Sequence, residues 1–266
     1  MPEPDTALRA PAAGTVPVRA LLGEQTAATL LSNIVYLYRH HFGVAFWICL
    51  LPVAPFLLLK QLVDTVAPSW SMLAYVPYLA VTFLATAALT MVLSDLCLGQ
   101  RPTVRRAYAR VFEQGRWWQV LATSAIITLA TWLGFVLLVV PGLWVMVRSL
   151  FAPAVVMLEG KPARAAIRRS FELTRGQAWR LAGLALMPAL LAYALGILLA
   201  FLLGVAIALG DLESTPVEHL LMALAYMAML ALLFPTVAAS LVLLYYDQRA
   251  RRESYDVQAL AEDLMR

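Results

Sequence analysis

The sequence is poor in the residues from which catalytic and metal-binding sites are built. Its 266 residues include two cysteines and three histidines, and no HExxH, Walker, GxSxG or CxxC motif occurs. Cys49 and Cys97 fall within or at the edge of apolar segments, which is typical of packing residues rather than of a disulfide or metal pair. Metal, phosphate-loop and nucleophile-elbow chemistry therefore lack support, and we expect a protein that is not an enzyme and has no cofactor.

Charge is also scarce, because 14% of the residues are charged whereas 62% are hydrophobic. The mean hydropathy is +0.78. About a quarter of the residues of a soluble domain are charged, so this composition predicts an all-α integral membrane protein. A helical crossing needs roughly 20 apolar residues. We expect about six transmembrane helices, at Phe42–Leu59, Ser69–Leu93, Trp117–Val140, Leu143–Leu158, Leu181–Leu209 and Leu220–Tyr246. The fourth is short and contains Arg148, so a re-entrant or strongly tilted hairpin is the alternative.

The N-terminal residues lack the apolar core of a cleavable signal peptide, because they are rich in proline and alanine up to about Leu30. We expect a disordered lead over residues 1–24, a helical membrane domain over 25–250 and an amphipathic tail over 251–266.

Lysine and arginine are distributed unevenly. Eighteen of the 20 lie in the N-terminal lead, the loops after the second and fourth spans, and the C-terminal tail. The opposite loops hold acidic residues, namely Asp64, Asp211, Glu213 and Glu218. With six spans, the positive-inside rule places both termini in the cytoplasm. The pI of about 9.2 then reflects topology, and we expect no nucleic-acid partner.

Two basic segments between spans share a pattern. Gly99-Gln-Arg-Pro102 precedes a segment that runs to Gly115, and Gly160-Lys-Pro162 precedes one that runs to Gly176. Apolar residues at helical spacing oppose the arginines, which predicts amphipathic helices in the membrane interface. A weaker copy runs from Ala27 to His41 and ends at Gly43. We predict a pseudo-threefold repeat of three hairpins, each preceded by an interfacial helix, with units at about 25–98, 99–160 and 161–250. Chance similarity among apolar segments is the alternative.

The second span of each unit ends near one carboxylate, which is Asp95, Glu159 or Asp247. The helix macrodipole disfavours negative charge there, so we expect structural ion pairs with arginines of the adjoining interfacial helices. A proton-coupled site facing water is the alternative. Prolines recur inside the spans, and each leaves a backbone carbonyl for neighbouring groups to satisfy.

Arg148 interrupts an apolar run, at a cost of about 2.5–3.5 kcal/mol on insertion scales. One interpretation is a contact to an anionic headgroup or substrate, and the other is snorkelling or pairing with Asp95 or Asp247. Further candidate contacts to anionic lipid or substrate are Arg105, Arg106, Arg164, Arg168 and Arg175.

The stretch EGKPARAAIRRSFELTRGQAWRLAGL and the tail from Leu244 to Asp256 resemble the membrane domain found beside glycerophosphoryl diester phosphodiesterases, and related stand-alone bacterial inner-membrane proteins. The resemblance covers Leu93 to Asp256 best. In the enzymes a separate soluble domain performs hydrolysis, whereas about ten residues follow Asp256 here. The resemblance therefore implies a helical membrane domain without the catalytic domain.

Together these features predict a non-enzymatic inner-membrane protein of membrane lipid or envelope homeostasis, or a scaffold for a partner. Its expected partners are anionic membrane lipids and a protein partner or a second copy of the chain. The alternative is a permease or exporter for a small molecule or lipid, which would use the kinked spans and Arg148.

Overall fold

The computed structural model describes residues 26–97, 102–210 and 216–253, and these residues form helices and no strand. The expected lead and most of the expected tail lie outside the described residues. The helices are α2 (Ala27–Val66), η1 (Pro68–Trp70), α3 (Ser71–Cys97), α4 (Val104–Phe112), η2 (Glu113–Gly115), α5 (Arg116–Leu137), α6 (Val139–Arg148), α7 (Ala152–Glu159), α8 (Ala163–Thr174), α9 (Ala178–Leu209) and α10 (Pro216–Glu253).

Six of the described segments are long and apolar enough to cross a membrane, which indicates a multi-pass membrane protein. They are Gly43–Lys60, Met72–Leu96, Arg116–Leu137, Val139–Glu159, Ala178–Leu209 and Leu224–Arg252. The predicted all-α class is thereby confirmed, and each predicted span overlaps one of these candidate segments. Only 17% of the first and the fifth segment is buried within the protein, so most of each apolar surface is left for lipid.

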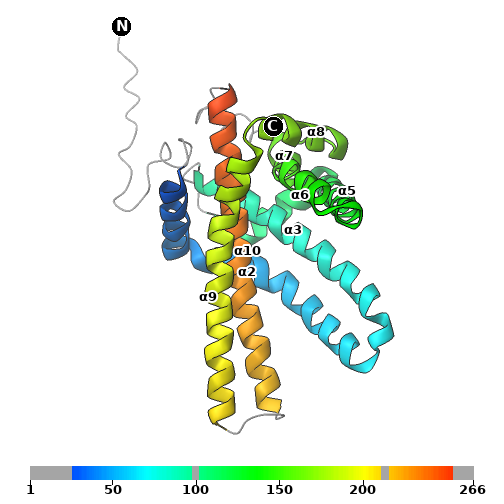
Figure 1. Cartoon of the computed structure of the whole chain (residues 1–266), viewed down its shortest axis with the longest axis vertical. Helices are drawn as coiled ribbons and strands as arrows, with labels where there is room; N and C mark the ends of the chain where they lie inside the picture. The colour runs from blue at the N-terminus through cyan, green and yellow to red at the C-terminus, as the bar shows by residue number, and fades with distance from the viewer. Residues whose placement is uncertain (1–25, 98–101, 211–215, 254–266) are drawn as a thin grey trace.

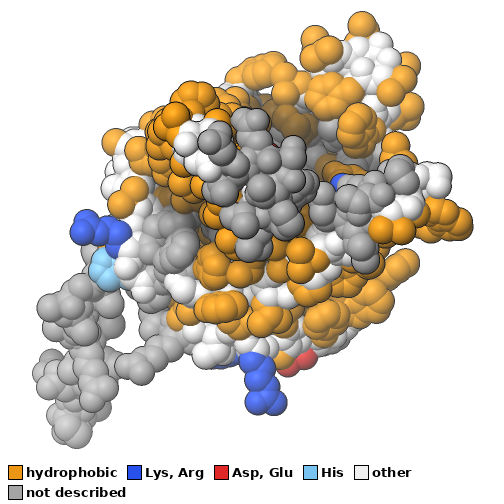
Figure 2. Space-filling model, turned by 90° about the horizontal axis from the view of Figure 1, so that it is seen from below, with side chains coloured by type: hydrophobic (Ala, Val, Ile, Leu, Met, Phe, Trp, Pro, Cys, Tyr) orange, Lys and Arg blue, Asp and Glu red, His pale blue; other side chains and the backbone are white. Residues whose placement is uncertain are grey.

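Three pairs of consecutive helices pack against each other: α2 with α3, α5 with α6, and α9 with α10. Figure 1 shows α9 and α10 as the longest pair, with α7, α8 and the end of α10 gathered at one end of the molecule. We call this the basic end. Figure 2 shows the opposite end, where hydrophobic side chains cover most of the described surface. Leu51, Met72 and Leu209 are among the large apolar side chains that the described structure exposes.

The predicted fourth span consists of two helices, because α6 ends at Arg148 and α7 begins at Ala152. α6 has ten residues and is therefore about 15 Å long, roughly half the hydrocarbon thickness of a bilayer. Six of the eight α7 residues are buried, so protein rather than lipid surrounds this helix. Arg148 is thus the last residue of α6, and it lies at the break in the middle of the apolar segment Val139–Glu159.

The first predicted interfacial helix is not separated from its span, because α2 runs without interruption from Ala27 to Val66. Gly43 lies within it, whereas the junction glycines Gly115 and Gly176 have left-handed backbones, with φ of 69° and 75°. A glycine is tolerated inside a helix at a cost of about 1 kcal/mol relative to alanine, so Gly43 by itself does not mark a helix end. Figure 1 nevertheless draws the first turns of α2 (dark blue) in a different direction from its remainder.

A single residue, Leu138, joins α5 to α6, and two glycines allow the helices to approach closely beside it. A Cβ on Gly134 would lie 2.7 Å from the Cα of Gly142. A Cβ on Gly142 would lie 2.7 Å from the Phe135 ring and backbone. The residues around this turn, from Val136 to Val140, are all strongly exposed and apolar. The turn is therefore a close-packed, wholly apolar tip.

We predict that Gly142→Ala lowers the free energy of unfolding by about 1–3 kcal/mol, because backbone atoms cannot move aside for the added methyl group. The matched control is Gly183→Ala in α9, where nothing lies within 4 Å of the added Cβ. There the better helix propensity of alanine should leave stability equal or slightly higher. Thermal unfolding of the purified proteins in detergent measures both, and equal effects at the two positions would contradict the close approach.

Candidate functional site

Two short helices at the basic end, α4 and α8, each have a buried and a basic face. Ala107 and Val111 are buried in α4, and Ala166, Ser170 and Leu173 are among the buried residues of α8. The opposite faces expose the predicted lipid contacts, namely Arg105 and Arg106 on α4 and Arg164 and Arg168 on α8. The buried face fixes each helix against the spans, and the arginines point away from them.

α4 is attached to α2 through a backbone group that a proline leaves open. Pro52 has no N–H to bond the carbonyl of Ile48 one turn earlier, which would otherwise be unpaired. The Tyr108 hydroxyl of α4 donates to this carbonyl at 2.8 Å. Burial raises the pKa of the Tyr108 phenol well above its ordinary value, so the hydroxyl keeps its proton at physiological pH.

α8 satisfies the backbone at the break between α6 and α7 in a similar way. The Ser170 hydroxyl donates to the Arg148 carbonyl at 2.8 Å and accepts from the Phe151 N–H at 3.1 Å. Thr174 also donates to the Arg148 carbonyl, at 3.4 Å. Ser170 is fully buried. The broken span is therefore completed by side chains of the amphipathic helix that follows it.

The structure brings two of the predicted carboxylates to cations of α4 and α8. Asp95, at the end of α3, accepts from Arg110 of α4 at 2.6 Å, and its side chain is 1% exposed. Glu159, at the end of α7, lies 3.4 Å from Arg169 of α8 and 2.5 Å from Lys161. The Tyr245 hydroxyl of α10 donates to the same Glu159 carboxylate at 2.9 Å. These contacts join the ends of α3, α7 and α10 to the two basic helices.

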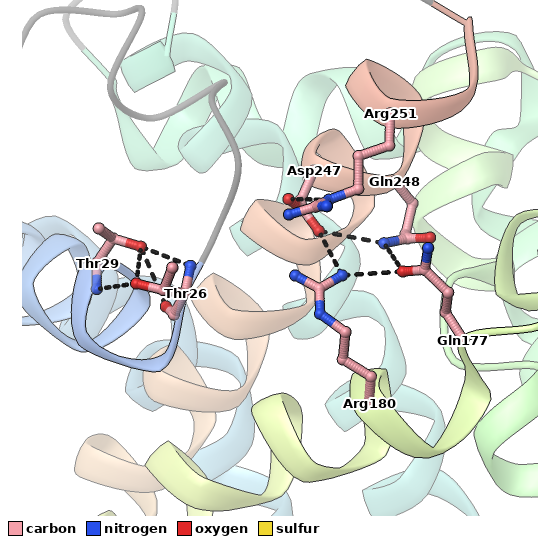
Figure 3. Close-up of polar contacts among 7 residues, drawn as sticks. All are labelled: Thr26, Thr29, Gln177, Arg180, Asp247, Gln248 and Arg251. Carbon is pink, nitrogen blue, oxygen red and sulfur yellow. Dashed lines mark hydrogen bonds and ion pairs between the residues drawn. The ribbon is translucent and has the colours of Figure 1, made fainter.

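Asp247 is fully buried and links α10 to the start of α9 (Figure 3). It accepts from Arg251 at 2.9 Å, from Gln248 at 3.1 Å and from Arg180 at 3.5 Å. Arg180 also donates to the Gln177 amide oxygen at 2.9 Å. These three partners lie on α9 and α10 and hold the two helices together at this end.

Arg148 packs beside two aromatic rings that contact each other, rather than against an acid. Its guanidinium carbon lies 5.6 Å from the centre of the Trp144 ring and 5.2 Å from that of Phe171. Among the described side chains it pairs with neither Asp95 nor Asp247, and its buried Nε atom has no hydrogen-bond partner. Arg175 and Arg252 lie close enough to add electrostatic repulsion. Arg148 is therefore a half-buried cation without a protein counter-ion in the part of the chain that the structure describes.

A cleft of about 440 Å³ lies beside Arg148, between α6 and the start of α9. Its lining is Leu143, Trp144, Val147, Arg148, Gly176, Gln177, Ala178, Trp179 and Arg180. Of the predicted contacts, the structure brings only Arg148 to this cleft, and Arg175 lies next to it in the chain. Arg180, Trp144 and Trp179 were not predicted, because their positions become meaningful only once α6 and α9 are known to be adjacent. Within the described residues, no group of three or more His, Cys, Asp or Glu side chains is placed to hold a metal ion.

We predict that Tyr108→Phe destabilises the protein by about 1–3 kcal/mol, because it leaves the buried Ile48 carbonyl unpaired. Pro52→Ala restores the N–H that bonds this carbonyl within α2. In the Pro52→Ala protein, Tyr108→Phe should therefore cost much less. Unfolding of the wild type, both single variants and the double variant measures this coupling. An equal cost in both backgrounds would show that the hydroxyl does not replace the missing N–H.

We also predict that Arg110→Gln destabilises the protein by about 3–5 kcal/mol, because the buried Asp95 carboxylate loses its cation. Adding Asp95→Asn removes the buried charge and should recover part of the loss. Arg106→Gln is the matched control, since this arginine lies on the exposed face of the same helix. The same unfolding measurement applies, and a similar loss in Arg106→Gln would contradict the assignment.

Comparison with curated proteins and with solved structures finds no significant match to this chain. The resemblance to the membrane domain of glycerophosphoryl diester phosphodiesterases stays a prediction. A family described as a domain of unknown function (DUF7847) matches residues 115–249. This half of the chain extends from α5 into α10 and includes α8, the cleft and Asp247. On this match, the chain belongs to the DUF7847 family of domains of unknown function.

Proposed function

We propose that the chain is a non-enzymatic multi-pass protein of a bacterial inner membrane whose helices α4 and α8 bind the anionic cytoplasmic leaflet. Its role would be membrane lipid or envelope homeostasis, or the scaffolding of a partner at that surface. One observation carries the proposal. Buried hydrogen bonds fix α4 and α8 against the spans, and their opposite faces expose four arginines: Arg105, Arg106, Arg164 and Arg168.

The positions of these helices support the proposal. Asp95 binds Arg110 of α4, and its neighbour Ser94 is 2.9 Å from the Tyr246 hydroxyl near the end of α10. α4 and α8 therefore lie at the same end of the molecule. Each arginine near an anionic leaflet contributes about 1 kcal/mol, so four give at most roughly 4 kcal/mol, or about a thousandfold in affinity.

The pseudo-threefold repeat forms part of the same proposal. The packed pairs α2–α3, α5–α6 and α9–α10 and the left-handed glycines before α5 and α9 support it. In this arrangement the end of α3 carries α4, and the end of α7 carries α8. Each basic helix is then attached at the point where one pair ends and the next begins.

We predict that the purified protein, reconstituted into nanodiscs of mixed phosphatidylglycerol and phosphatidylcholine, enriches phosphatidylglycerol among its bound lipids. Replacing Arg105, Arg106, Arg164 and Arg168 together by Gln should abolish most of the enrichment. The same four changes to Lys should retain it, because charge and not hydrogen-bond geometry is responsible. High salt should also reduce it, since the screening length falls from about 8 Å at 0.15 M to 3 Å at 1 M. Lipid composition is measured by mass spectrometry, and an unchanged enrichment in the Gln variant would refute the proposal.

A further inference from the structure

The cleft between α6 and α9 combines two kinds of lining that suit an amphiphile. Leu143, Val147 and Ala178 give it an apolar side, and Arg148, Arg180 and Gln177 give it a polar and cationic side. A volume of about 440 Å³ falls in the range of small-molecule sites. A ligand with a negative head and an apolar body would match both sides.

Positive charge predominates among the described side chains at the cleft. Asp247 accepts from Arg180, which lines the cleft, and from Arg251. Arg148 has no such partner among the described residues, and Arg175 and Arg252 increase the positive potential around it. A half-buried cation without a counter-ion is costly, so a bound anion would stabilise the site.

Arg148 is held in a fixed position for such a contact. Its guanidinium lies against both Trp144 and Phe171, whose rings contact each other edge to face with centres 5.5 Å apart. The backbone behind it is fixed by Ser170. A planar guanidinium matches the oxygens of a phosphate bidentately, and its fixed position reduces the entropy lost on binding.

The position of the cleft along the helices favours a lipid as the source of the phosphate. Ala178, Trp179 and Arg180 form the first turn of α9, so the cleft lies at the end of a span, where lipid headgroups lie. Trp144 and Trp179 are 51% and 70% exposed, and tryptophan is enriched at this level of membrane proteins. The apolar walls then lie beside the acyl chains.

We infer that the cleft binds the phosphate headgroup of one anionic phospholipid, with Arg148 as its main contact and the apolar walls against its chains. This inference rests on the proposed function in one respect only, namely that the basic end faces a leaflet containing anionic lipid. It differs in stoichiometry and in residues. One lipid is bound at Arg148, whereas the exposed arginines of α4 and α8 attract many lipids.

Native mass spectrometry of the full chain in detergent, titrated with dioctanoyl phosphatidylglycerol, tests the inference. The wild type should bind one lipid with preference over dioctanoyl phosphatidylcholine. Arg148→Gln should weaken this binding roughly tenfold or more, because a charged hydrogen bond is lost. Arg148→Lys should recover it only in part. Ala178→Phe fills the cleft while leaving Arg148 in place and should also prevent binding, which guards against an effect of Arg148 on folding alone.

The matched control is Arg164→Gln with Arg168→Gln, which removes two exposed arginines of α8 outside the cleft and should leave the single lipid bound. Equal binding of both lipids, or one lipid retained in both Arg148→Gln and Ala178→Phe, would overturn the inference. In a separate experiment, the protein is titrated with inorganic phosphate and its melting temperature is measured. If it raises the melting temperature through Arg148 as strongly as the lipid does, the site binds a soluble phosphate and not a lipid. Loss of nanodisc enrichment with retention of the single lipid would overturn the proposed function alone.

Discussion

Every backbone N–H and carbonyl inside a membrane needs a partner within the protein, and the two amphipathic helices supply partners where the spans do not. Pro52 leaves the Ile48 carbonyl in α2 without its helical hydrogen bond, and the Tyr108 hydroxyl of α4 donates to this carbonyl instead. The break between α6 and α7 opens the Arg148 carbonyl and the Phe151 N–H, and Ser170 of α8 pairs both. The basic helices are thus part of the membrane domain and are not appendages on its surface.

The same helices combine structural and surface roles on opposite faces. Arg110 and Arg169 bind the buried carboxylates Asp95 and Glu159, so these two arginines are committed to the fold. Arg164 and Arg168 lie on the exposed side of α8, where their charge is available to lipid. The exposed side chain of Arg168 also lies 3.7 Å from Glu172, an exposed pair that contributes little to stability. The adjacent residues Arg168 and Arg169 therefore have different roles, because Arg169 binds a buried carboxylate and Arg168 faces outward.

The extent of prediction from the sequence differs between elements for physical reasons. The spans were predictable because contact with lipid constrains the composition of long runs, and α4 and α8 were predictable because proline and glycine bracket them. The bond from Tyr108 to Ile48 was not, since its partners are 60 residues apart and no local pattern connects them. The helix break after Arg148 was not predictable, because a hydrophobic run does not reveal where a helix is interrupted. Gly43 was misinterpreted because a lone glycine is compatible with a continuous helix.

The bond between Tyr108 and Ile48 has a consequence for biosynthesis. The Ile48 carbonyl is made 60 residues before the hydroxyl that pairs it, which at 5–20 residues per second corresponds to about 3–12 s of translation. The break at Ser149 waits for Ser170, a shorter interval of 19–22 residues. During these intervals the nascent spans carry open polar groups, which water or the insertion machinery must cover. The order of synthesis therefore determines when the polar groups of each span are paired and the span can enter the lipid.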